Sequence, residues 1–358
     1  MEFLSVSGTK IVNGAGDEVL LRGTNAGGWL VHEEWMCPTK APDAKTIRDT
    51  LAARFGEETR DALIDAYRDA YWTERDFDNC AAMGMTCLRL PFHYWDVAGF
   101  ERLDWFVEHC ARRGMYVVLD LHGAYGSQNG KHHSGQINDG RQLYFNEGNR
   151  AKTIRLWEEI ARHYKGSAAV AMYDLLNEPE RDTGETDQVQ WDYYDELYRA
   201  VRAVDPDHII TMEACWWPRS LPSPKDYGWE NVVYQYHHYP WGLKAAEDIN
   251  EDSRGECDLI EQSAYGVPVF IGEFCKFNCP EAWEYGLGLY NALGYHWTTW
   301  CYKVTGDGGS SWGCYNHDPP RADVAADSAE EIRAKWARTG WEHAVETPYK
   351  RIMEKYLQ

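Results

Sequence analysis

Eight short apolar runs, each followed by a polar or amphipathic segment, limit the folds that this chain can adopt. Most runs are rich in Val, Ile, Leu or aromatic residues and end in Gly, Pro or polar residues, as buried parallel strands do. Eight such alternations along 358 residues predict an α/β fold, a closed (β/α)8 barrel. The runs are Val19–Gly23, Thr86–Phe92, Tyr116–Gly123, Ala171–Pro179, Ile209–Cys215, Val232–Tyr239, Pro268–Phe274 and Tyr295–Lys303.

Helical periodicity between the runs supports the same architecture. A doubly wound open sheet is the runner-up, but no G-x-G-x-x-G turn follows the first run. After Cys215, closely spaced prolines predict a short or irregular connection instead of a helix. The expected helices are Glu74–Met83, Glu101–Arg113, Asn149–Tyr164, Trp191–Val204, Asp258–Tyr265 and Pro280–Leu293.

The segments outside these alternations predict additions to the barrel. Asn13-Gly14 lies between apolar residues and predicts an N-terminal β-hairpin that caps the barrel bottom. Long excursions at residues 30–72 and 304–326 predict elaborated βα loops, which in compact domains are often functional. The first excursion carries two helical patterns, Ala44–Phe55 and Glu57–Tyr71, and the tail 327–358 also reads as helical. Since no linker composition interrupts the chain, residues 1–358 are expected to form one domain.

Charge and hydropathy exclude several classes of partner. The chain has 36 Lys+Arg and 57 Asp+Glu, a net charge of −21, which disfavours nucleic acid and anionic lipid surfaces. No apolar run approaches the ~20 residues of a membrane span. The N-terminus lacks a basic stretch followed by an apolar core, so we expect either a cytoplasmic protein or a secreted one whose signal peptide was removed. No pattern predicts an oligomeric state.

Aromatic residues are unusually frequent, with 17 Trp and 23 Tyr. Flat aromatic faces suit ligands that have apolar faces and polar rims, as sugars do. The alternative is that a large chain simply needs large core residues, and the count alone separates the two weakly. Several Trp residues stand beside Gly, Pro or acidic residues in expected loops, namely Trp29, Trp35, Trp216, Trp217, Trp241 and Trp312.

The ends of the apolar runs carry the chemistry. In (β/α)8 enzymes the active site lies at the C-terminal ends of the strands. Glu178 and Glu273 end the fourth and seventh runs, so they are expected to face each other across the barrel. Paired carboxylates are what glycosidic cleavage needs. Other polar or aromatic residues at run ends are Arg89, Asp120, His122, Asn177, His237, His238, Tyr239 and Trp300.

Each of these residues also has a structural interpretation. Asn177-Glu178-Pro179 can be a helix-entry turn, Glu273 can simply neutralise a buried Arg89, and His122 can be a core histidine. A metal site at His237-His238 is disfavoured, because no H-x-H ends the first run and no Cys or Asp cluster joins it. Their joint occurrence at successive strand ends favours catalysis over a non-catalytic sugar-binding protein or a metal-dependent hydrolase.

These positions resemble glycoside hydrolase family 5, a retaining (β/α)8 family. Two longer stretches are similar to its exo-β-1,3-glucanase branch. Leu21–Val31 resembles the opening L-R-G-V-N-L-G-G-W-L, and Leu121–Gly130 resembles the loop L-H-G-A-P-G-S-Q-N-G, with His133-Ser134-Gly135 also fitting. Thr24, Ala26 and Tyr125 depart from the branch. Residues 216–230 and 304–326 do not align with it, and because these loops border the sugar subsites, the linkage and exo or endo action stay open.

The resemblance implies a role for each matching residue. Glu178 would be the general acid/base and Glu273 the nucleophile, with a carboxyl separation of about 5–5.5 Å. The remaining residues would form the substrate-binding site. Arg89 and Tyr239 would keep Glu273 ionised, and Asn177 would bind the sugar 2-OH. His122 and His237 would orient the sugar and the carboxylates, Trp300 would form a platform under the sugar, and Glu33 and, as a weaker candidate, Asp139 would bind sugar.

The resemblance also implies a substrate class. A β-glucan is expected, with β-1,3 linkages and exo attack favoured and without a metal or organic cofactor. A β-1,4-glucanase, a lichenase or another β-glycosidase on the same scaffold is the nearest alternative, since such enzymes differ in loops more than in catalytic residues.

Overall fold

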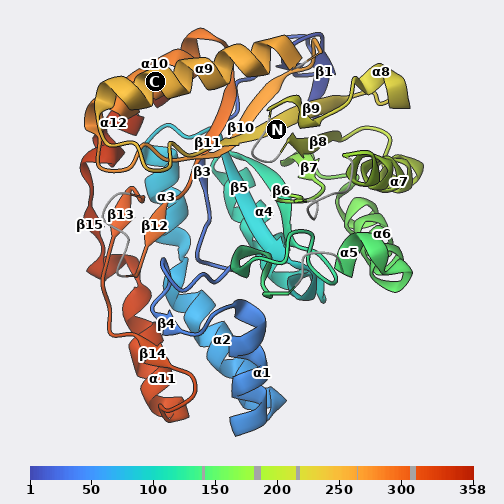
Figure 1. The fold of residues 1–358 in the computed structure, drawn as a ribbon. Helices are drawn as coiled ribbons and strands as arrows, with labels where there is room; N and C mark the ends of the chain where they lie inside the picture. Colours follow the sequence, from blue (N-terminus) through green and yellow to red (C-terminus); the bar gives the residue numbers. More distant parts are fainter. Residues whose placement is uncertain (139–141, 181–186, 215–217, 264, 307–311) are drawn as a thin grey trace.

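The eight apolar runs form a closed barrel of parallel strands in the computed structural model (Figure 1), which describes residues 1–138, 142–180, 187–214, 218–263, 265–306 and 312–358. The strands follow chain order around the barrel, and β10 and β11 close it onto β9 and β3. The (β/α)8 prediction is therefore confirmed. The barrel strands are β3 (Arg22–Asn25), β5 (Cys87–His93), β6 (Tyr116–Gly123), β7 (Val170–Asp174), β8 (Ile209–Ala214), β9 (Val232–His238), β10 (Val269–Phe274) and β11 (His296–Thr299).

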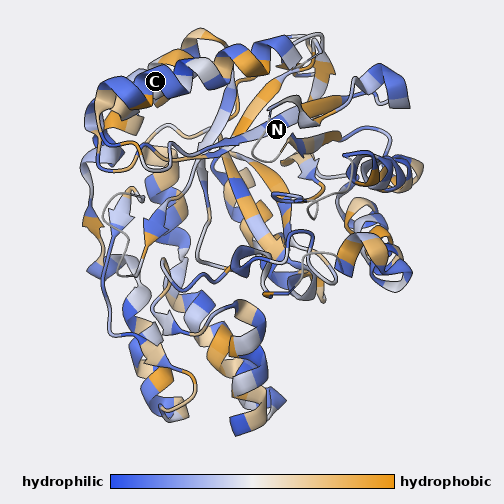
Figure 2. Cartoon of the chain, in the orientation of Figure 1, coloured by the Kyte–Doolittle hydropathy of each residue, from blue (hydrophilic) through white to orange (hydrophobic). Residues whose placement is uncertain are grey.

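Amphipathic helices surround the barrel and cover its apolar strands (Figure 2). Helix α4 buries Leu103, Phe106 and Cys110 at helical spacing while Glu101 and Glu108 face solvent, which is the pattern of a helix packed on a sheet. The outer helices are α3 (Glu74–Ala82), α4 (Glu101–Arg112), α6 (Glu147–Tyr164), α7 (Gln188–Val204), α9 (Ala246–Ser263), α10 (Pro280–Ala292) and α12 (Pro348–Leu357).

An N-terminal hairpin closes the barrel bottom, as predicted. Strands β1 (Ser5–Ser7) and β2 (Lys10–Val12) pair antiparallel, and Asn13–Asp17 then turns the chain so that Val12 bridges Glu18. The turn that connects β1 and β2 is therefore at residues 8–9, and the predicted turn at Asn13-Gly14 follows the second strand. Leu4 and Ile11 of this hairpin pack against residues from the lower barrel strands, including Cys87, Val118, Met172, Ile209, Val233 and Phe270.

Several expected boundaries were wrong, and the eighth strand, for example, ends at Thr299 and not at Lys303. The first barrel strand begins at Arg22, because the backbone of Val19 bonds to Ile11 in the cap instead of to the barrel. The fourth strand ends at Asp174, so Leu175–Pro179 leave the sheet. Helix α9 begins at Ala246, well before the expected Asp258. Its buried stripe of Ile249, Ser253, Cys257 and Ile260 is narrow and lies among many exposed acidic residues, so the sequence pattern did not reveal the first turns.

The two long excursions add a second layer beside the barrel. Helix α2 (Glu57–Tyr71) packs with α1 (Ala44–Phe55) and with α11 (Ala329–Trp336), and the three helices lie in the lower part of the view in Figure 1, away from the hairpin. The second excursion contributes β12 (Lys303–Val304), β13 (Tyr315–Asn316) and β14 (Ala322–Asp323). Strand β13 pairs with β12 and with β15 (Val345–Glu346), and β14 pairs with β4 (Thr39–Lys40).

The connection after β8 is short and irregular, as the prolines predicted. Its described part consists of a 3-10 turn at Pro218–Ser220 and α8 (Pro224–Tyr227), while residues 215–217, with Trp216 and Trp217, lie outside the described residues. Among the helices that the structure describes, none combines the length and hydropathy needed to cross a bilayer.

Candidate active site

Arg89 of β5 is the hub of the polar cluster inside the upper barrel. Its side chain is fully buried, and every nitrogen meets a partner, so its charge is neutralised by a fixed set of acceptors. Nη1 donates to Oε1 of Glu273 (2.8 Å) and Nε to Oδ2 of Asp174 (2.8 Å). Nη2 donates to Oδ1 of Asn177 (2.9 Å) and lies 3.1 Å from Oδ2 of Asp120. A buried guanidinium therefore ties four strand ends together.

Glu178 and Glu273 come together over one imidazole. Glu178 follows β7, and Glu273 stands at the end of β10. Nδ1 of His237 lies 3.0 Å from Oε1 of Glu178 and 3.5 Å from Oε2 of Glu273. The distance between these two oxygens therefore cannot exceed the sum of those two distances. This upper limit reaches only the lower end of the carboxyl separation of inverting glycosidases, roughly 6.5–9.5 Å.

The surroundings separate the acidities of the two glutamates. Burial raises the pKa of both, because the charged form loses water. The guanidinium of Arg89 and the hydroxyl of Tyr239, which donates to Oε2 at 2.7 Å, oppose that rise in the pKa of Glu273. The pKa of Glu178 is raised well above its usual value by burial and by the neighbouring Glu273. Glu273 is thus the first to ionise and Glu178 keeps its proton longer.

The other predicted residues surround this pair. The buried amide nitrogen of Asn177 has no hydrogen-bond partner among the described residues, so it is a free donor at the site. Nδ1 of His122 lies 2.7 Å from Oδ2 of Asp120, which orients the ring. The His122 ring stacks on the indole of Trp300, with ring centroids 5.3 Å apart and planes at 10°. The structure therefore brings these predicted residues to one place.

Glu33 joins the site from the loop after β3. It is buried and accepts hydrogen bonds from the indole of Trp35 (2.8 Å), while one oxygen lies 2.9 Å from Nε2 of His132. Burial opposes ionisation, but His132, His133 and Trp35 outweigh it and lower the pKa of Glu33. Asp139, the weaker sugar-binding candidate, lies outside the described residues.

The carboxylates open into a cavity of about 560 Å³, here called the barrel-mouth pocket. Three indoles form one wall: ring centroids of Trp35 and Trp312 are 4.6 Å apart, and those of Trp241 and Trp312 are 5.7 Å apart. Trp241 is 60% exposed, an unusual state for a tryptophan that binds nothing. The pocket is lined by Glu33, Trp35, His122, Lys131, His132, His133, Glu178, Tyr239, Trp241, Glu273, Trp300 and Trp312.

Sequence comparison places this geometry in a known family. Residues 45–306 match the family model described as cellulase (glycosyl hydrolase family 5). The chain belongs to glycosyl hydrolase family 5. It is therefore a glycoside hydrolase by family, and the resemblance seen in its motifs is confirmed.

Individual relatives differ in name. The chain is 31% identical to a β-xylosidase of Phanerodontia chrysosporium over 346 residues, 86% of this chain and 72% of that protein. It is 31% identical to a probable glucan 1,3-beta-glucosidase A of Neosartorya fischeri over 273 residues, 71% of this chain but only 65% of the relative's length. The crystal structure of a rutinosidase from Aspergillus niger superposes with a TM-score of 0.66 at 17% identity, covering 89% of this chain and 98% of that one, which supports the fold alone.

Sequence reasoning missed several residues of this family 5 site. Glu213 at the end of β8 lies beside Glu178 and His237, and His133 has Nε2 3.1 Å from Oε2 of Glu178. A signal for Glu213 existed, because it is a charged residue at the end of the apolar run Ile209–Cys215, as Arg89 is within its own run. His133 belongs to the stretch His133-Ser134-Gly135 that fits the family branch, but its position beside Glu178 depends on how the loop after β6 folds back.

Within the part of the chain that the structure describes, two clusters bring carboxylate and imidazole donors close enough together for one cation. They are Glu33 with His132 and His133, and Glu178 with Glu213 and His237. In both clusters an imidazole nitrogen already meets a carboxylate oxygen at hydrogen-bond distance, 2.9 Å and 3.0 Å. Hydrogen bonds therefore already engage part of each donor set.

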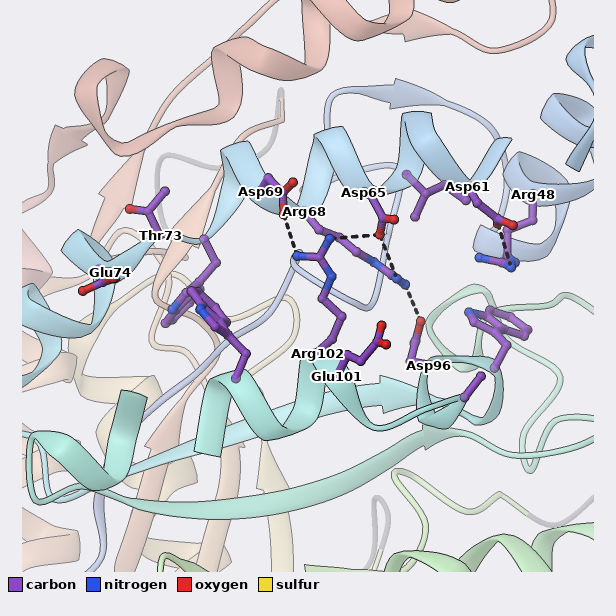
Figure 3. Close-up of a pocket in the computed structure, with 15 residues that line it drawn as sticks. Arg48, Asp61, Asp65, Arg68, Asp69, Thr73, Glu74, Asp96, Glu101 and Arg102 are labelled. Atoms are coloured by element: carbon purple, nitrogen blue, oxygen red, sulfur yellow. Dashed lines mark hydrogen bonds and ion pairs between the residues drawn. The ribbon is translucent and has the colours of Figure 1, made fainter. Parts of the chain in front are cut away.

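A second cavity of this hydrolase, about 770 Å³, lies on the outside of the barrel between α2 and α4 (Figure 3). Three arginines here meet carboxylates: Nη1 of Arg102 donates to Asp69 (2.5 Å), Arg68 pairs with Asp96, and Arg48 lies 3.7 Å from Asp61. The indole of Trp95 stacks with the ring of His93, and the guanidinium of Arg48 lies over it. Trp95 thus already has ring and cation partners within the protein, and we assign this outer cavity no ligand.

Proposed function

We propose that the protein is a retaining β-glucan hydrolase that cleaves β-1,3-glucosidic bonds from a chain end by double displacement. The observation that carries the proposal is the meeting of the Glu178 and Glu273 carboxyls at one imidazole nitrogen of His237, with these oxygens no farther apart than the lower edge of the inverting range. The proposal treats residues 1–358 as one catalytic domain and requires no metal or organic cofactor.

In the first step, a carboxylate oxygen of Glu273 attacks the anomeric carbon of the sugar. The bond from that carbon to the leaving oxygen breaks, and Glu178 gives its proton to this oxygen, so the departing sugar leaves as an alcohol. Arg89 and Tyr239 hold Glu273 in position by hydrogen bonds of 2.8 and 2.7 Å. The product is a glycosyl ester on Glu273.

In the second step, Glu178 acts as the base. It accepts a proton from water, the water oxygen attacks the anomeric carbon, and the ester bond to Glu273 breaks. The free amide nitrogen of Asn177 is suited to donate to the sugar 2-OH, a contact that strengthens in both transition states. The stacked pair of Trp300 and His122 supports the sugar ring.

The linkage assignment depends on motifs and relatives. The loop residues Leu121–Gly130 and the opening residues Leu21–Val31 resemble the exo-β-1,3-glucanase branch, and relatives 31% identical or less carry the name glucan 1,3-beta-glucosidase. The wall of Trp35, Trp241 and Trp312 offers aromatic surface for further sugar units of the chain.

A β-xylosidase is the second candidate, because the relative of that name matches a larger share of this chain, 86% against 71%. Glucose and xylose differ in the hydroxymethyl group at carbon 5, so the two candidates differ in which sugar fills the position above Trp300. Comparing kcat/KM on p-nitrophenyl β-glucoside and β-xyloside separates them.

The test is analysis of products over time on a soluble β-1,3-glucan, with Glu273→Gln as the inactive control. Glucose alone from the earliest time supports exo attack. A ladder of oligosaccharides supports endo action instead. Absence of products with the wild type rejects the β-1,3 assignment, and β-1,4- and mixed-linkage glucans are then tested. Undiminished activity in Glu273→Gln rejects the double-displacement mechanism itself.

A further inference from the structure

Glu213 is a third carboxylate at the catalytic pair, and it is completely buried at the end of β8. Its Oε2 accepts the backbone N–H of Glu178 at 2.7 Å and lies 3.3 Å from the amide nitrogen of Gln235. Its Oε1 has no hydrogen-bond partner among the described residues and lies 3.3 Å from Nδ1 of His237. One imidazole nitrogen therefore faces three carboxyl groups.

The contact to Glu178 is made where the backbone is strained. Glu178 has φ = 42°, in the left-handed region that non-glycine residues rarely occupy. In this conformation its N–H points to Glu213, which satisfies a donor that would otherwise be buried without a partner. Glu213 thus helps to hold the main chain of Glu178, and with it the direction of the Glu178 carboxyl.

A carboxyl group in this place is costly for the fold. Buried carboxylates need compensating partners, yet Arg89 already serves Asp120, Asp174 and Glu273. The titratable groups that face Glu213 and Glu178 from the surrounding elements include more acids than permanent cations. They are Asp174 on β7, His237 and Tyr239 on and after β9, Glu273 on β10, Arg89 on β5, Glu33 from the loop after β3, and Lys131 and His133 from the loop after β6.

We propose that Glu213 is a positioning residue for the acid/base, which fixes the strained main chain of Glu178 and keeps the proton on the Glu178 carboxyl until the leaving group takes it. The inference rests on the proposed retaining mechanism, in which Glu178 must be protonated for the first step.

Electrostatics gives the second half of this role. Two carboxyls that face the same imidazole cannot both ionise easily, so the first of Glu213 and Glu178 to ionise makes the other hold its proton more tightly. Burial, followed by the neighbouring Glu178, raises the pKa of Glu213 well above its usual value, so the two carboxyls titrate as a coupled set. The loss of one member lowers the pH at which Glu178 loses its proton.

The test is Glu213→Gln, which keeps an oxygen that accepts the N–H of Glu178 and removes only the ionisable group. Wild type and variant are compared by the pH dependence of kcat/KM on a β-glucoside and by thermal unfolding at pH 7. We expect the alkaline limb to move to lower pH by about one unit or more. We also expect the melting temperature to rise, because a buried carboxyl with an unsatisfied oxygen is removed.

Asp205→Asn is the matched control. Asp205 is equally buried, but Tyr173, His208 and the backbone satisfy both of its oxygens, far from the pocket at the start of β8. Its loss is expected to lower the melting temperature and to leave the alkaline limb in place.

The outcomes separate the two proposals. An unmoved alkaline limb in Glu213→Gln, or a variant that is less stable than wild type or does not fold, overturns the role of Glu213. Absence of wild-type turnover on every β-glycoside rejects the proposed function instead, and the unfolding comparison still reports on the burial of Glu213.

Discussion

The outer cavity and the barrel-mouth pocket use the same residue types in opposite ways. In the outer cavity, Arg48, Arg68 and Arg102 meet four carboxylates between them, and most of those carboxylates are exposed to water (Figure 3). In the barrel-mouth pocket one buried guanidinium, that of Arg89, contacts three carboxylates, and further carboxyls face an imidazole.

This difference teaches that cavity size does not identify a catalytic site. The outer cavity is larger, about 770 against 560 Å³, but its charges are paired and most of its carboxylates are solvated, so they change little when a ligand arrives. The carboxyls of the pocket are buried and outnumber their cation, so their proton affinities are shifted, and shifted proton affinity is what acid/base catalysis uses.

Removal of either catalytic carboxyl is expected to have the largest effect. Glu273→Gln should lower kcat on p-nitrophenyl β-glucoside by at least about 10³-fold, because no ester can form. Glu178→Gln should lose about 10²–10⁴-fold on this substrate. It should lose less with a dinitrophenyl leaving group, which departs without a proton. Either variant within tenfold of wild type on the first substrate contradicts its assigned role, provided circular dichroism shows an unchanged fold.

Breaking the buried hub is expected to affect stability most. Arg89→Met leaves Asp120, Asp174 and Glu273 buried without their cation, so the free energy of unfolding should fall by about 3–5 kcal/mol. Urea unfolding at pH 7 measures it. Arg89→Lys should recover only part of this loss, since an ammonium lacks the planar fork that reaches all partners. Full recovery by lysine would mean that charge alone, and not geometry, holds the cluster.

The pH dependence of stability should distinguish the pocket from ordinary carboxylates. The pKa of Glu178 is raised in the folded state, so the folded protein binds more protons than the unfolded one above about pH 4.3. The free energy of unfolding should therefore fall as pH rises above that value, by up to about 1.4 kcal/mol per pH unit for each such proton. Glu178→Gln should have a shallower slope and be more stable at pH 8. An identical slope in both proteins contradicts the shift.

The outer cavity should give the smallest effect. Arg102→Met removes the partner of Asp65 and Asp69, yet the side chains are largely solvated, so unfolding free energy should change by no more than about 1 kcal/mol. The change should shrink in 1 M salt, and kcat/KM should stay at the wild-type value. A loss of activity in Arg102→Met would mean that the outer cavity takes part in substrate binding, and the comparison above would fail.

Strand ends were the most readable part of the site. Arg89, Glu178 and Glu273 could be predicted because each stands in or after an apolar run, and barrel topology brings such positions together. Glu213 carried the same signal in its own run. His133 and the wall formed by Trp35, Trp241 and Trp312 come from loops, whose paths depend on long-range packing and not on local pattern.

The sequence by itself determined the barrel, the order of its strands and which strand ends carry acids. The reason is that eight alternating strands and helices bury their apolar faces when the strands close into a barrel and the helices cover it. Only the tertiary structure decided how the acids share their partners. The placement of three carboxyls around one nitrogen of His237 depends on side-chain directions and on the strained backbone of Glu178. Proton affinity in a buried cluster varies steeply with distance and solvation, and neither is encoded in any single segment.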